Sequence, residues 1–109
     1  MKPLPAASMH IALALLDGEL HGYALMRRVE ELSGGAVRMG AGTLYGTISR
    51  LLERGLIVET TDAVDREEAE RRRYYELTAD GRVAAITELE RLRMLVSRVD
   101  HHLPGTAPA

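Results

Sequence analysis

Apolar residues recur at helical spacing through the first half of the chain and predict three helices. The apolar run at 9–16 predicts a first helix over about 8–16, which ends at an Asp-Gly turn. A second helix is predicted over about 22–33, because the glycines that follow it are typical helix stops. A third helix is predicted over about 42–54, and its buried side carries Leu44, Ile48, Leu51 and Leu52.

The hydrophobic period then changes from helical to strand-like. The segment "LIVETT" at 56–61 is short and rich in β-branched residues, and "RRRYYEL" at 71–77 places Tyr75 and Leu77 on one face. The residues between these segments, at 62–70, are polar and charged. We therefore expect a β-hairpin with a long polar tip. Three helices followed by a hairpin is the element order of a winged helix-turn-helix.

A long final helix is predicted from an N-cap at Thr78 to about His102. At 1.5 Å per residue it is about 36 Å long, which is more than the small domain before it can cover. Its apolar positions step by four and three residues, as in a coiled-coil seam. We therefore expect it to pair with a second copy of the chain; the alternative is a helix folded back on its own domain. The residues expected at the dimer interface are Ala85, Leu89, Leu92, Val96, Val99 and Leu103.

The predicted fold class is mainly α with a small β-hairpin: a winged helix-turn-helix followed by a long C-terminal dimerisation helix. Residues 1–7 contain two prolines and no periodicity, so they predict a flexible arm. The winged domain is expected over 8–77 and the dimerisation helix over 78–103. Residues 104–109 are expected to form a disordered tail.

The composition narrows the classes of protein to be considered. The chain has 109 residues, the size of one small domain. It has no cysteine, which excludes a disulfide framework, a thiolate metal site and a Cys nucleophile, and is compatible with the cytoplasm. Its longest apolar run is far too short to span a bilayer, so no membrane partner is expected.

Charge is distributed unevenly along the chain. The formal net charge is −2, which argues against a generally basic surface for nucleic acid. No acidic residue lies between Glu31 and Glu53, whereas two arginines fall inside this span. The acidic residues gather instead at 59–70 and along the last helix. Any contact with DNA therefore has to use the acid-free span.

Several motifs, in order, resemble those of the PadR family of bacterial transcriptional regulators. They are "HGY" at the start of the second helix, "GTLY" at the start of the third, "GLI" before the wing and "RRRYYELT" after it. The resemblance runs from about Met9 to Val99, and the single helix after the wing is typical of the short subgroup. It implies a homodimeric winged-helix protein that binds double-stranded DNA and is usually a repressor. Some family members bind small aromatic effectors, which leaves a small-molecule effector open here without identifying it.

The third helix is predicted to be the recognition helix in the major groove of a near-palindromic operator. Small side chains at Thr43, Gly46 and Thr47 permit a close approach to the base edges. Arg50 can reach a phosphate or a guanine edge. Tyr45 can donate a hydrogen bond to a phosphate, and the alternative that it packs in the core is equally open.

Basic residues near this helix are candidate phosphate contacts. Arg71, Arg72 and Arg73 form a run at the base of the wing, and strand alternation places Arg72 on the face opposite the other two. The alternative is that they pair with acidic residues of the same hairpin. Arg38, in the connector before the recognition helix, is a further candidate.

No catalytic set, cofactor or metal site is expected. The glycines form no phosphate-binding loop and no nucleophile elbow is present. His101 and His102 are adjacent in sequence, so they do not form a metal-binding pair on one helix face. The sequence therefore predicts a cytoplasmic, non-enzymatic transcriptional regulator, with a winged-helix module for protein interaction as the alternative.

Overall fold

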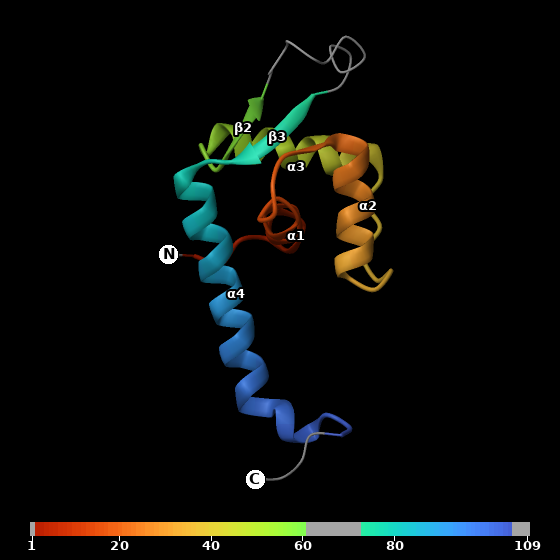
Figure 1. The fold of residues 1–109 in the computed structure, drawn as a ribbon, viewed down its shortest axis with the longest axis vertical. Helices are drawn as coiled ribbons and strands as arrows, with labels where there is room; N and C mark the ends of the chain where they lie inside the picture. The colour runs from red at the N-terminus through yellow and green to blue at the C-terminus, as the bar shows by residue number, and fades with distance from the viewer. Residues whose placement is uncertain (1, 61–72, 106–109) are drawn as a thin grey trace.

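The computed structural model describes residues 2–60 and 73–105 and has the element order expected for a winged helix-turn-helix (Figure 1). The predicted wing tip at 62–70 and the end of the tail, 106–109, lie outside the described residues, as do Arg71 and Arg72. The elements are α1 (Ala6–Ala14), β1 (Leu20–His21), α2 (Gly22–Leu32), α3 (Ala41–Glu53), β2 (Ile57–Thr60), β3 (Tyr74–Leu77), α4 (Ala79–Val99) and a 3-10 turn (Asp100–His102). The mainly helical fold class with a long C-terminal helix is confirmed.

The three strands form one antiparallel sheet in the order β1-β3-β2. Leu77 pairs with Ile57 at one end of the β2–β3 ladder, and Tyr74 pairs with Thr60 at the other end. β1 was not predicted, because two residues carry no pattern of their own and are a strand only through pairing with β3. Tyr75 lies at the centre of the sheet and is buried.

The main core forms around α1, which lies between α2 and α4 (Figure 1). Since the chain has no Phe or Trp, this core is aliphatic except for one tyrosine. α2 and α3 contribute their apolar stripes, as the helical period predicts. Its buried members are Ile11, Ala14, Leu15, Leu25, Val29, Leu44, Ile48, Leu51, Ile57 and Tyr75.

A second, smaller cluster attaches α4 to α1 and corrects two expectations. Ala85 is 0% exposed and packs with Ala12, so it belongs to the core of its own protomer rather than to a dimer seam. Leu4 is buried in the same cluster, and its N–H donates to the Glu88 Oε1 at 2.9 Å. This part of the expected flexible arm is therefore docked on α4, and α1 begins two residues earlier than predicted.

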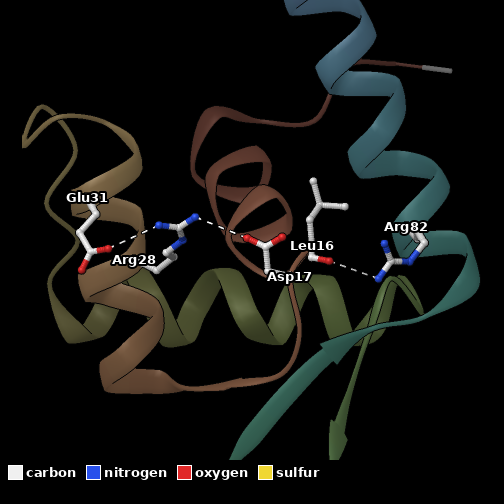
Figure 2. A network of polar contacts seen from close by, with 5 residues as sticks. All are labelled: Leu16, Asp17, Arg28, Glu31 and Arg82. Carbon is white, nitrogen blue, oxygen red and sulfur yellow. Dashed lines mark hydrogen bonds and ion pairs between the residues drawn. The ribbon is translucent and has the colours of Figure 1, made fainter.

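Polar side chains tie the turn after α1 to the helices on both sides (Figure 2). Arg28 of α2 lies between two carboxylates, 3.5 Å from Asp17 and 3.4 Å from Glu31. Arg82 of α4 donates to the Leu16 carbonyl at 3.4 Å. Exposed pairs of this kind contribute about 0–1 kcal/mol each, so they orient the helices more than they stabilise them.

The junction between α3 and α4 is the tightest point of the fold. Gly55, with φ of +71°, ends α3 and turns the chain directly into β2. The Thr78 side chain caps α4 by accepting from the Gly81 N–H at 3.0 Å, as predicted, and also donates to the Gly55 carbonyl at 2.7 Å. Gly81 is buried, and a methyl group at this position would collide with the Leu56 carbonyl. The first turn of α4 thus rests directly on the end of α3.

We predict that Gly81→Ala destabilises the protein, although alanine is the better helix former. The added methyl group meets the Leu56 carbonyl, so the junction has to open. Overpacking of this kind lowers the free energy of unfolding by about 1–3 kcal/mol. The measurement is urea denaturation followed by circular dichroism at one fixed protein concentration. The matched control is Gly46→Ala, where the nearest atom lies 3.8 Å from the added carbon; equal shifts in both variants would contradict the packing argument.

Candidate nucleic-acid interface

One side of α3 faces away from the core and carries small or polar residues. The other side is buried against α1 and the sheet through its apolar stripe. The outward positions follow the helical repeat and are Gly42, Gly46, Ser49, Arg50 and Glu53. Since Glu53 is the last residue of the helix, the acid-free span of the sequence becomes an acid-free surface over the first three turns.

The two glycines on this side have no packing role inside the protomer. A Cβ at Gly42 meets nothing within 4 Å, and one at Gly46 meets only the tip of Arg50 at 3.8 Å. Glycine in a helix lowers stability by roughly 0.5–1 kcal/mol relative to alanine. The two glycines therefore lower the stability of the helix and keep this surface flat. No packing contact within the described protomer requires a glycine at either position.

The expectation that Thr47 faces outward is wrong. Its side chain is 0% exposed, because one step of the helix turns it from the Gly46 side toward Leu51. The Thr47 hydroxyl donates to the Thr43 carbonyl at 2.7 Å and accepts from the Arg50 Nη2 at 3.2 Å. Thr47 therefore can affect the outward surface only by holding Arg50. Thr43 is exposed, as expected.

Tyr45 lies at the start of α3 and is 48% exposed, so the alternative that it is a core residue is wrong. Its ring lies over the start of α2, where a Cβ on Gly22 would be 2.5 Å from the phenol oxygen. Gly22 therefore allows the two helix N-termini to approach. The His21 side chain caps α2 at the same point by accepting from the Ala24 N–H at 3.3 Å.

A groove of about 690 Å³ opens where these helix starts meet the wing strand. It is lined by two arginines and two tyrosines, and none of its lining residues is acidic. The N-terminus of α2 adds a positive dipole. The groove is therefore suited to an anion. Its lining residues are His21, Gly22, Tyr23, Ala24, Arg27, Tyr45 and Arg73.

Comparison with known proteins identifies the family. The sequence model of the transcriptional regulator PadR-like family matches residues 12–88. The chain belongs to this family. It is 41% identical over 104 residues to the transcriptional regulator Rv3488 of Mycobacterium tuberculosis, which covers 92% of this chain and 91% of that protein.

Two further similarities differ in extent. The chain is 38% identical over 93 residues to an uncharacterized 37.1 kDa protein in transposon TN4556 of Streptomyces fradiae. That match covers 85% of this chain but spans only 25% of the transposon protein. A solved PadR family regulator from Clostridium difficile R20291 has a TM-score of 0.75 at 21% identity, covering 91% of this chain and 99% of that one, which supports the fold.

Arginines of this PadR-like regulator that were predicted to contact phosphate are paired with carboxylates in the protomer. The Arg38 Nε lies 3.0 Å from the Glu30 Oε1, and the Arg73 Nε lies 3.6 Å from the Glu59 Oε1. Both arginine side chains remain at least 75% exposed. Exposed pairs are weak, so both guanidinium groups can exchange a carboxylate for another anion.

Tyr75, behind the Arg73–Glu59 pair, is a structural residue. Burial raises the pKa of the Tyr75 phenol above its ordinary value, the Glu59 carboxylate raises it further, and Arg73 partly opposes both effects. The phenol therefore stays neutral at any physiological pH. It lies in the main core and anchors the central strand of the sheet.

Sequence reasoning missed three residues of this interface. Tyr23 and Arg27 line the groove one helical turn apart, with the guanidinium carbon 5.9 Å from the ring centroid. The signal was a Tyr and an Arg at i and i+4 on the side of α2 opposite its apolar stripe. Ser49 lies between the outward glycines and Glu53, and its spacing of three residues from Gly46 was the available signal.

α4 continues beyond the part of the helix that packs on α1 (Figure 1), and its apolar stripe continues along that extension. Its side chains are between 36% and 60% exposed in the protomer. The stripe includes Leu95, which the sequence analysis missed, and begins after Ala85. Its members are Leu89, Leu92, Leu95, Val96 and Val99. Leu103, predicted as the last position of the seam, is also exposed but lies beyond α4 and the 3-10 turn, in extended backbone.

Two other kinds of site are absent from residues 2–60 and 73–105. No group of three or more His, Asp or Glu side chains there is arranged to hold a metal ion. Over the same ranges, no helix is both long enough and apolar enough to cross a bilayer. The PadR-like family is one of transcriptional regulators rather than enzymes.

We predict that Gly42→Ala and Gly46→Ala each stabilise the protein. Neither added methyl group meets a clash, and alanine favours the helix. The free energy of unfolding should therefore rise by about 0.5–1 kcal/mol for each. Urea denaturation measures this, with the exposed Ser49→Ala on the same side as a reference that should gain less than either glycine variant, because serine costs a helix less than glycine does. A loss of stability in either glycine variant would show that the glycines have a packing role after all.

Proposed function

We propose that this PadR-like protein is a sequence-specific DNA-binding regulator that inserts α3 into the major groove. The observation that carries the proposal is the outward side of α3, which is small, acid-free over three turns and unexplained by packing within the protomer. A helix fits the major groove only where its outward side chains allow a close approach. Thr43, Gly46 and Arg50 lie where a recognition helix contacts bases.

The groove beside α3 supports the same proposal from the electrostatic side. A phosphate in this groove would meet the Arg27 and Arg73 guanidinium groups, the Tyr45 hydroxyl and the N-terminus of α2. Such contacts position a protein on the duplex without reading sequence. Arg38 extends the basic surface, and Arg71 and Arg72 stay predictions outside the described residues.

We further propose that the regulator is a homodimer paired through α4. The exposed apolar stripe lies on a helix that extends past its own domain, and a second copy related by two-fold symmetry would cover it. Two recognition helices related in this way read a near-palindromic operator with half-sites about 34 Å apart. Repression, by occupying a promoter in the cytoplasm, is the regulatory role we propose; a small-molecule effector is left unassigned.

We predict that Arg27→Ala and Arg50→Ala weaken DNA binding in different ways. A duplex selected by the wild-type protein from a random pool serves as operator, and its affinity is measured by fluorescence anisotropy across a salt series. Arg27→Ala should weaken binding to all duplexes and reduce the salt slope by about one. Arg50→Ala should lower the preference for the operator over random DNA by about 5- to 100-fold.

Arg93→Ala on α4 is the matched control, since it removes the same charge away from α3. Failure to retain any duplex, or binding that is insensitive to salt, would replace the proposal by the alternative of a protein-interaction module.

We predict that Val96→Glu converts the dimer into a monomer. Val96 is half exposed in the protomer, so the charge should leave the fold intact while disrupting a covered apolar stripe. Sedimentation equilibrium at micromolar concentration measures the change. Val83→Glu, an equally exposed apolar position on the opposite side of α4, is the matched control and should remain dimeric. A monomeric wild type would refute pairing through α4.

A further inference from the structure

Thr47 has no exposed surface of its own, yet its hydroxyl makes two hydrogen bonds in series. It donates its one proton to the Thr43 carbonyl at 2.7 Å, so it can act only as an acceptor toward Arg50. The Arg50 Nη2 donates to it at 3.2 Å. The chain from Thr43 through Thr47 to Arg50 therefore has a fixed direction and ends at the guanidinium group.

This contact holds the guanidinium of Arg50 along α3. Its Nη1 lies 3.8 Å from the position that a Cβ on Gly46 would occupy, so the group folds back over the flat glycine surface. An arginine side chain carries roughly 2 kcal/mol of rotamer entropy, part of which is lost on binding. A guanidinium already held in place loses less of it when it binds.

The acceptor that holds Arg50 is neutral, in contrast to those of the neighbouring arginines. Arg28, Arg38 and Arg73 are each paired with a carboxylate. Within the part of the chain that the structure describes, Arg50 has no carboxylate partner, and its one polar side-chain contact is to the Thr47 hydroxyl. Its positive charge is therefore oriented without being neutralised, and its other N–H groups remain available to a base.

We propose that Thr47 is a positioning residue that aims Arg50 at the O6 and N7 acceptors of one guanine. This inference rests on the proposed function, because it assumes that α3 reads the major groove. A bidentate contact between arginine and guanine needs a defined guanidinium plane. The acceptor also explains the presence of threonine, a β-branched and poor helix former, within the helix. Valine would fill the same buried space but would lack the hydroxyl that accepts from Arg50.

The test compares Thr47→Val with Thr47→Ser on the selected operator. The base pair to be tested is found first with Arg50→Ala. It is the one whose replacement lowers the affinity of the wild type but no longer lowers that of the variant. Discrimination at this base pair should fall about tenfold in Thr47→Val and remain near wild type in Thr47→Ser, which keeps the hydroxyl. Affinity for random duplex and its salt slope should be unchanged in both variants, because no phosphate contact is altered.

A double-mutant cycle separates the positioning role from general effects. Thr47→Val combined with Arg50→Ala should discriminate no worse than Arg50→Ala alone. If Thr47→Val destabilises the fold, Thr47→Ser and Thr47→Ala form a second pair that differs only in the hydroxyl. Equal discrimination in that pair, or wild-type discrimination in Thr47→Val, would overturn the positioning role while leaving DNA binding intact. If the wild type binds no duplex at all, both the positioning role and the proposed DNA binding are overturned.

Discussion

Two backbone carbonyls at the end of α3 fix the position of α4 relative to α3. These two helices carry the surfaces proposed for pairing and for DNA binding. The carbonyl of Gly55 accepts from the Thr78 hydroxyl, and that of Leu56 accepts from the Thr78 N–H at 3.0 Å. Gly81 lets the first turn of α4 settle against the same backbone. Because α3 enters this junction and α4 leaves it, the direction of α3 relative to α4 depends on a few backbone contacts.

Other contacts attach α4 to the rest of the fold and support this junction. Arg82 ties the start of α4 to the turn after α1, and Glu88 ties its middle to the segment before α1. The buried Glu88 carboxylate accepts from the Leu4 N–H of the N-terminal segment and from the Arg91 guanidinium within α4. In a two-fold dimer, the spacing of the two reading helices would then be a property of packing within each protomer.

Periodicity predicted most elements, and its misses share a physical cause. α2, α3, α4 and the hairpin strands follow from repeats that one segment displays alone. β1 and the docked Leu4 depend on partners more than 50 residues away in the chain, which local pattern does not contain. Thr47 and Ala85 are border positions, where a turn of about 100° per residue leaves a stripe edge ambiguous. The groove was missed because α2, α3 and the residue before β3 contribute to it separately.

Three arginines of the candidate interface are held in two different ways in the unbound protein. Arg38 and Arg73 are held by exposed carboxylates, which a phosphate can replace at little free-energy difference, since one weak exposed pair is exchanged for another. Arg50 is held by a neutral hydroxyl, so under the proposed function it would not have to release this contact to meet a base edge. Phosphate contacts tolerate the first arrangement because they only position the protein, whereas reading a base edge demands the second. The group that holds an arginine therefore decides which task suits it: a carboxylate partner suits contact with phosphate, and a neutral hydroxyl partner suits contact with a base edge.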